Sequence, residues 1–350
     1  PDGSGWTPYG PEDGLPPRSQ GQALAIGTAG EVWAYLLWEG VYRFDGERWA
    51  AVAGVPGGLV SDLALDADGQ PWLAGCGSQH YPGGCLATRD GETWTRPLAE
   101  LGLGVTGPLA VGPEGQVAAG TTLGLALYEV EGPRLLRDGP THDRATAVAI
   151  TADGAAWFAF GDHSTSTPGG GVSRFVDPGP AAAAGARPGS ETGSGWDYFL
   201  DDAEVTALAV APDGALWAGA GCEVHRYDGS AWRLMGGCSQ DLPPGNVFDL
   251  AFTPDGSAWV ANGFGLARFD GVTWTSYDQR VHSLAATADG ALWAEGWQGQ
   301  PGSAIVARLD EEGWTTYAAA DALPGGFRVG AATPDGRLWG TVPGGLAAFD

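Results

Sequence analysis

The chain has 350 residues, 42 of them acidic and 17 basic, which gives a formal net charge of −25 at pH 7. A surface this acidic repels phosphate backbones and anionic bilayers, so it argues against nucleic acid and membrane-surface partners. No apolar stretch reaches the roughly eighteen residues of a membrane span, and we expect no signal peptide within this sequence. Sixty Gly and 25 Pro, with 43% apolar residues, indicate a turn-rich all-β protein with an ample core.

The first predicted element is a short strand at Trp6–Tyr9, and eight copies of one four-stranded unit follow it. The copy from Asn246 to Tyr277 is the clearest. It predicts two strands around the turn 254–256 and two more around Asp270-Gly271, because Asp and Gly tolerate the positive φ of tight hairpins. Four short strands cannot bury both faces alone, so each unit needs its copies as neighbours.

Ala recurs in the first strand of every copy, five residues before the Gly of the first turn, which indicates crowding around a central axis. These residues are Ala25, Ala64, Ala110, Ala149, Ala209, Ala251, Ala285 and Ala331. Trp recurs in the second strand of every copy but the third: Trp33, Trp72, Trp157, Trp217, Trp259, Trp293 and Trp339. A further Trp marks the fourth strand: Trp6, Trp49, Trp94, Trp196, Trp232, Trp274 and Trp314. We expect these fourteen Trp to pack between units.

The repeats predict an eight-bladed β-propeller of four-stranded antiparallel blades, forming a single domain over residues 1–350. The eighth copy breaks off before its fourth strand, and Trp6–Tyr9 resembles Trp274–Tyr277. Residues 1–9 are therefore expected to supply the closing strand of the last blade. Seven blades is the alternative, if the third copy, which lacks both Trp, folds irregularly. The Ala/Gly/Pro-rich stretch 178–195 predicts a flexible low-complexity loop.

The four cysteines fall into two local pairs, Cys76 with Cys85 and Cys222 with Cys238. Neither spacing has the C-x-x-C form of zinc sites, so no metal is expected. Two disulfides are favoured over free thiols, and they indicate an extracellular or periplasmic protein.

The repeated pattern V-x-x-L-A-h-x-x-D-G-x-h-W, followed by G-L-x-R-F-D-G-x-x-W-x-x-Y, resembles the two-component-regulator propeller repeats of bacterial extracytoplasmic sensors. The resemblance covers nearly the whole chain. It implies the propeller fold and a ligand-sensing role, often a carbohydrate-responsive one. Streptogramin lyases are also propellers with D-G-x-h-W copies, but no arrangement of His and Glu in this chain carries over residue by residue.

In a propeller the connections between blades, and those between second and third strands, emerge on one face, here called the upper face. Loops there vary without disturbing the packing. Flat aromatic rings on this face suit sugar faces, while polar groups fix hydroxyls. The alternative for Trp38 and Trp297 is that they merely cover blade edges. The candidate ligand-binding residues on this face and at the channel mouth are Trp38, Tyr81, Phe248, Phe264, His282, Trp297, Gln298 and Arg328.

Arg recurs in the third strand, at Arg43, Arg174, Arg226, Arg268 and Arg308, and we interpret these residues as ion-pair partners of the turn Asp residues. The sequence favours a monomeric, extracytoplasmic sensor-type propeller that binds a glycan or small polar ligand without a cofactor. A protein interaction platform is the alternative. A hydrolase or lyase is a second alternative, and no catalytic residue is assigned because no G-x-S-x-G or H-E-x-x-H motif is present.

Overall fold

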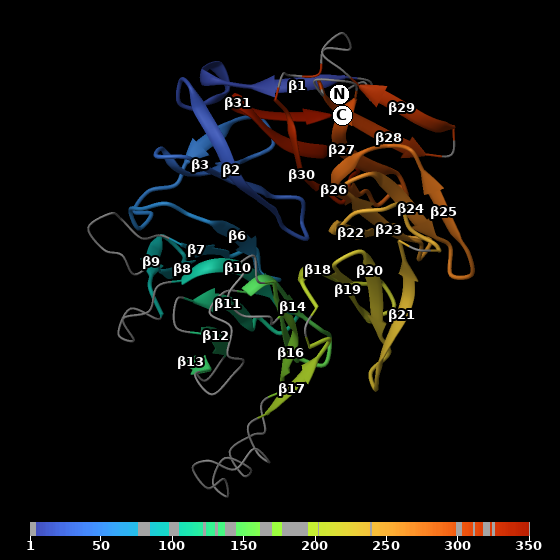
Figure 1. The fold of residues 1–350 in the computed structure, drawn as a ribbon. Helices are drawn as coiled ribbons and strands as arrows, with labels where there is room; N and C mark the ends of the chain where they lie inside the picture. The colour runs from blue at the N-terminus through green and yellow to red at the C-terminus, as the bar shows by residue number, and fades with distance from the viewer. Residues whose placement is uncertain are drawn as a thin grey trace, which may run out of the picture.

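The computed structural model describes residues 5–75, 85–97, 105–121, 124–129, 132–136, 145–161, 170–176, 195–201, 203–238, 240–298, 303–310, 312–317, 323 and 326–349 (Figure 1). These residues form an all-β protein whose one helical element within the described ranges is a short 3₁₀ turn, η1 (Pro11–Asp13). The predicted flexible stretch 178–195 lies outside the described residues except for Gly195. No helix among the described residues is long and apolar enough to cross a membrane.

The strands follow the predicted repeat in chain order. The first four units are β2 (Ser19–Ile26), β3 (Val32–Leu36), β4 (Gly40–Phe44), β5 (Trp49–Ala51); β6 (Asp62–Leu65), β7 (Pro71–Ala74), β8 (Leu86–Asp90), β9 (Thr93–Thr95); β10 (Val105–Val111), β11 (Val117–Thr121), β12 (Gly124–Glu129), β13 (Gly132–Leu136); and β14 (Ala145–Ile150), β15 (Ala156–Phe160), β16 (Gly171–Phe175), β17 (Trp196–Phe199). The rest are β18 (Val205–Val210), β19 (Leu216–Ala220), β20 (Glu223–Tyr227), β21 (Trp232–Gly237); β22 (Val247–Phe252), β23 (Ala258–Asn262), β24 (Gly265–Phe269), β25 (Trp274–Tyr277); β26 (Val281–Ala286), β27 (Leu292–Gln298), β28 (Ser303–Asp310), β29 (Gly313–Tyr317); and β30 (Arg328–Ala332), β31 (Leu338–Phe349), β1 (Trp6–Tyr9).

The strands pair into six four-stranded antiparallel sheets and one seven-stranded sheet, β1-β31-β2-β3-β4-β5 with β30 on β31. The first part of β31 pairs with β30 and its last part with β1, so the seven-stranded sheet combines the first unit with the completed eighth one. The first strands of the eight units contact one another in order, and β30 contacts β2. The chain therefore forms the closed ring of a β-propeller (Figure 1).

The predicted closure by the N-terminal strand is confirmed. Trp6 of β1 pairs with Phe349 and Tyr9 with Leu346, so the two ends of the chain share one sheet. The Trp6 ring contacts Phe327 at 4.6 Å and Trp293 at 6.1 Å between ring centroids. Because β1 covers the outer edge of β31, that edge is not left open for pairing.

The second-strand Trp residues pack against the next unit, as predicted. Trp33 lies in one cluster with Leu63 and Leu73 of the second unit, and Trp259 lies with Leu284 and Leu292 of the seventh. Val117, which replaces Trp in the third copy, is fully buried. The ring closes where Trp339 packs on Phe44 and Trp49 of the first unit, at 5.0 and 5.6 Å between ring centroids.

The repeated Arg residues pair with the turn Asp residues, as the sequence predicts. The ion pairs are Arg174 with Asp153 at 3.0 Å, Arg226 with Asp213 at 2.8 Å, Arg268 with Asp255 at 2.9 Å and Arg308 with Asp289 at 3.2 Å. The turn before Arg43 carries Ala29 instead of Asp, and the Arg43 guanidinium lies over the Trp33 ring at 5.6 Å. On the face opposite the upper one, these ion pairs thus join the first turn of a unit to its third strand.

The predicted bridge between Cys222 and Cys238 is present. It joins the connection after β19 to the residue that follows β21, on the upper face. Cys85 is also disulfide-bonded, and its predicted partner Cys76 lies outside the described residues.

The Trp339 contact predicts a large loss of stability on truncation. Trp339 is 1% exposed at the ring closure, so Trp339→Ala is expected to lower the free energy of unfolding by about 3–5 kcal/mol. Trp38, which is 71% exposed, provides the matched control, and Trp38→Ala should change stability by no more than about 0.5 kcal/mol. Denaturant unfolding measures both variants. Equal losses from the two substitutions would contradict closure by Trp339.

Candidate functional site on the upper face

The structure divides the predicted site residues into two groups. Phe248, Phe264, His282 and Arg328 belong to the sixth, seventh and eighth units, whereas Trp38 lines a groove at the first unit. The lining of that groove includes none of the other four residues, so we describe two upper-face sites. Tyr81 lies outside the described residues.

Trp297 and Gln298 were expected in a connection between strands, but they belong to β27. Their backbones pair with Ala304 and Ser303, so the hairpin of the seventh unit extends further than the repeat predicts. Glu295 lies inside the same strand opposite Val306 and is 5% exposed. The hairpin extends this far because no Pro lies between residues 292 and 298, and the one Gly among them, Gly296, pairs within the ladder.

A bulge in the first strand of the sixth unit and another in that of the seventh each turn one side chain toward the channel mouth. The pairing between β22 and β23 shifts between Val247 and Asp249, and that between β26 and β27 shifts between Val281 and Ser283. Phe248 and His282 are the residues that these shifts leave unpaired. A bulge turns a side chain out of the alternating pattern, so the two residues occupy equivalent positions on neighbouring strands.

Around these bulges, five residues form what we call the mouth strip: Phe248, Phe264, Arg280, His282 and Arg328. Phe248 is 48% and Phe264 56% exposed, and the Arg280 guanidinium lies over the Phe264 ring at 5.6 Å. A Cβ atom added to Gly263 would lie 3.4 Å from the Phe248 ring, which places Phe248 beside the turn that carries Phe264. Arg328 is close enough to His282 to oppose its protonation.

Two buried carboxylates anchor the strip by joining neighbouring units. The Asp249 carboxylate accepts hydrogen bonds from the backbone amides of Leu250 and Leu284, both at 2.8 Å. Glu295 Oε2 accepts one from Val329 N at 2.7 Å. The hydrogen bond from Leu284 to Asp249 joins the seventh unit to the sixth, and the one from Val329 to Glu295 joins the eighth unit to the seventh.

His282 is held by Glu295 at both ring nitrogens. Nδ1 lies 2.9 Å from the Glu295 backbone carbonyl oxygen and Nε2 lies 3.4 Å from Glu295 Oε1. Both partners accept, so the doubly protonated imidazolium satisfies both. The hydrogen bond to the Glu295 side chain accordingly raises the pKa of His282. In this arrangement the ring offers no free nitrogen for a general base.

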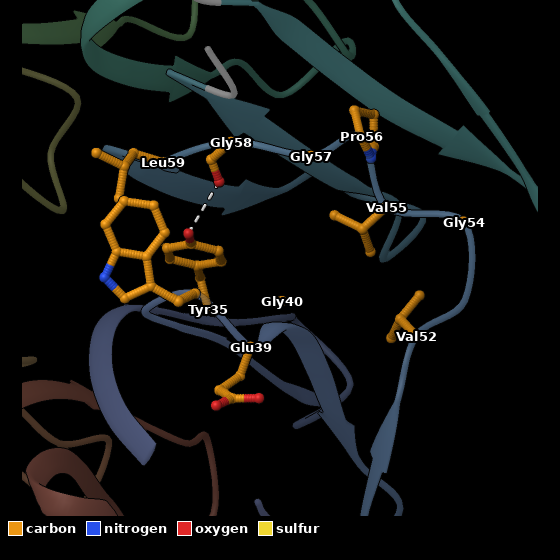
Figure 2. A pocket seen from close by; sticks show the side chains of 11 residues that line it. Tyr35, Glu39, Gly40, Val52, Gly54, Val55, Pro56, Gly57, Gly58 and Leu59 are labelled. Carbon is orange, nitrogen blue, oxygen red and sulfur yellow. Dashed lines mark hydrogen bonds between the residues drawn. The ribbon is translucent and has the colours of Figure 1, made fainter. Parts of the chain in front are cut away.

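The second site is the Trp38 groove, a hollow of about 600 Å³. It lies between the β3–β4 turn and the connection from β5 to β6, which confirms that these two kinds of connection meet on one face. The groove is lined by Tyr35, Trp38, Glu39, Gly40, Val52, Gly54, Val55, Pro56, Gly57, Gly58 and Leu59. Figure 2 shows Tyr35 reaching toward Gly58, whose carbonyl oxygen accepts its hydroxyl at 2.9 Å, with Val52 and Val55 on the side away from Leu59.

Trp38 is presented by a strained turn. Glu39 N donates to the Leu36 carbonyl at 3.0 Å, which closes a four-residue turn with Trp38 at its third position. Trp38 has φ 66°, in the left-handed region that such turns reserve for Gly. A bulky side chain there costs roughly 1–2 kcal/mol. Because Trp38 is 71% exposed, burial of its side chain does little to offset that cost.

The two sites contain features that sequence reasoning missed. Arg280 and Asp249 were not assigned to the mouth, and Glu39 and Leu59 were not assigned to the groove. One signal was available for Arg280: it lies outside the third-strand position at which Arg recurs. No group of three or more His, Cys, Asp or Glu residues within the described ranges is arranged to hold a metal ion.

Comparison with solved structures places the chain among β-propellers. A streptogramin B lyase matches with a TM-score of 0.56 and 13% identity, over 98% of this chain and 96% of that one. YCF48 bound to D1 peptide matches with a TM-score of 0.54 and 13% identity, over 99% and 96%.

A third match is the extracellular domain of the putative hybrid two-component system BT3049 from B. thetaiotaomicron. Its TM-score is 0.52 at 14% identity, covering 94% of this chain and 45% of that one. No family model matches the chain, and no curated protein matches it. The similarities show the fold, a β-propeller.

The buried mouth predicts a protein that is more stable at mildly acidic pH. Burial raises the pKa of Asp249 to about 6, from 3.8, despite the two amide hydrogen bonds. Between these values the folded state binds more protons than the unfolded state, so stability falls as pH rises. The raised pKa of His282 acts in the same direction, because its contribution is lost as pH rises through the folded value.

Denaturant unfolding should therefore give a free energy about 1–2 kcal/mol larger at pH 5 than at pH 8 from Asp249 alone. Asp249→Asn should reduce this difference. The exposed Asp68 is the control, because Asp68→Asn should leave the difference unchanged. An identical pH dependence in wild type and Asp249→Asn would contradict this assignment.

Proposed function

We propose that the protein is an extracytoplasmic ligand-binding propeller of the sensor type, and that the Trp38 groove binds a glycan or another small polar ligand. The observation that carries the proposal is the presentation of an exposed Trp on a strained turn at the edge of a groove. Strained backbone that is not relieved by burial is characteristic of binding sites.

The groove has the chemical parts that a sugar needs. The indole of Trp38 offers a flat face for the C–H surface of a sugar ring. The exposed Glu39 carboxylate accepts hydroxyl hydrogen bonds, and the glycines at 40, 54, 57 and 58 leave backbone groups accessible. A volume of about 600 Å³ fits one or two sugar rings.

The disulfide and the comparisons support the location. A bridge between Cys222 and Cys238 persists in an oxidising compartment, which favours an extracellular or periplasmic protein. The BT3049 match is itself an extracellular domain. We propose a monomer, since the ring closes on itself through β1.

A peptide is the second candidate ligand for the same groove. Val52, Val55, Pro56 and Leu59 give it an apolar side, and Leu59 is 40% exposed. YCF48, a propeller of similar architecture, is described with a bound peptide. If the ligand is a glycan, no peptide should displace it from the groove. If the ligand is a peptide, it should bind the groove when no sugar is present.

The test separates binding from folding. Trp38→Gly removes the indole and also relieves the positive φ, so it should leave stability unchanged or raise it by up to about 1 kcal/mol. The same variant should weaken binding of a neutral oligosaccharide found by glycan-array screening at least about tenfold, because the stacking face is lost. Calorimetric titration measures the affinity.

Leu234→Ala provides the control, because Leu234 is 58% exposed on β21, outside the groove. Its binding should equal that of the wild type. Unchanged affinity in Trp38→Gly, with the protein folded, would rule out the groove as the glycan site.

A further inference from the structure

The mouth strip carries positive charge in a strongly acidic protein. The chain has only 17 basic residues against 42 acidic ones. Most Arg residues of the repeat are committed to turn Asp residues, as in the Arg226–Asp213 pair at 2.8 Å. Arg280 and Arg328 are exposed, and no carboxylate within the described ranges forms an ion pair with either.

Two acidic groups beside the strip already have partners, and the exposed Asp278 lies two residues before Arg280 along the chain. Glu295 lies beside His282 and accepts a hydrogen bond from the amide of Val329. Asp249 accepts hydrogen bonds from the amides of Leu250 and Leu284. Both carboxylates are buried, whereas the two guanidiniums face solvent. His282 Nε2 lies 3.4 Å from the Glu295 carboxylate, and the exposed charges of the strip itself are the two guanidiniums.

The strip is also preorganised. Arg280 is stacked over Phe264, and such stacking restricts the guanidinium while its N–H groups still point outward. Arg328 begins β30, and the Glu295–Val329 hydrogen bond fixes the backbone of the following residue. Phe264 is fixed in turn by Asn262, which is 1% exposed and accepts from Phe264 N at 3.2 Å.

We propose that the mouth strip binds a ligand with a carboxylate carried on a flat ring, either an acidic sugar or an aromatic acid. Arg280 and Arg328 pair with the carboxylate, and the exposed Phe248 and Phe264 rings contact the ring of the ligand. Guanidinium and carboxylate match in geometry and charge. This site is independent of the Trp38 groove, which contains no basic residue.

Calorimetric titration with two matched pairs of probes tests the proposal. The pairs are galacturonate with galactose, and phenylacetate with phenylacetamide. At least one acid should bind about tenfold or more tightly than its uncharged partner, because a charge-assisted hydrogen bond is lost in the latter. Which pair shows the difference identifies the sugar or the aromatic source.

The variants locate the site. Arg280→Ala and Arg328→Ala should each weaken binding of that acid about tenfold, and raising the salt from about 20 to about 500 mM should weaken wild-type binding. Arg233→Ala makes the same charge change on β21, where Arg233 pairs with Asp228, and should have no effect. Trp38→Gly should also leave acid binding unchanged, so failure of the glycan groove is distinguishable from failure of this site.

Three results would overturn the proposal. Neither acid binds at millimolar concentration, the acids and their uncharged partners bind alike, or binding persists in both Arg variants. Binding of an acidic peptide that depends on Arg280 and Arg328, without binding of either ring acid, would assign the strip to a protein partner instead. Circular dichroism of each variant confirms that the fold is retained.

Discussion

Aromatic packing between neighbouring units is the constraint on which the whole ring depends. Each second-strand Trp lies under the sheet that follows it, so no unit is fully covered until its neighbour is in place. The last of these contacts, Trp339 on Phe44 and Trp49, spans the two ends of the chain. The pairing of Trp6 with Phe349 then fixes the same junction by backbone hydrogen bonds. Closure is thus both an apolar and a hydrogen-bonded event, and both depend on β1.

This division of labour leaves the upper face free to vary. The turns of the opposite face repeat one arrangement, in which Arg268 pairs with Asp255 and lies over Trp259 at 5.5 Å. Burial opposes ionisation there, but the hydrogen bonds from Thr253 and Ser257 and the charge of Arg268 lower the pKa of Asp255 to about 2. At the upper ends of the first strands, a bulge recurs from unit to unit, and the residue that it leaves unpaired differs between units.

The repeat made most of the fold predictable, because spacing within one unit is a local property. The positions of Trp33, Trp259 and the turn Asp residues specified strands, turns and ion pairs. The site was predictable only as a face. Asp249 and Glu295 reach the amides of the next unit, and the groove forms between a turn and a connection separated by more than ten residues; both depend on how two units meet. Arg328 lies three residues before the repeat Ala331, as Phe248 and His282 lie before theirs, but in β30 the shift is between Val329 and Ala331, two residues further along.

The charge of the protein bears directly on how an anion reaches the mouth. A net charge of −25 opposes the approach of any anion, yet at about 0.1 M salt this field is screened beyond about 10 Å. Within that range the nearest charges dominate, and the exposed cations of the strip are Arg280 and Arg328. The two Arg residues near the channel mouth are therefore informative, because the chain has only 17 basic residues and four of the five repeat Arg residues are paired with turn Asp residues.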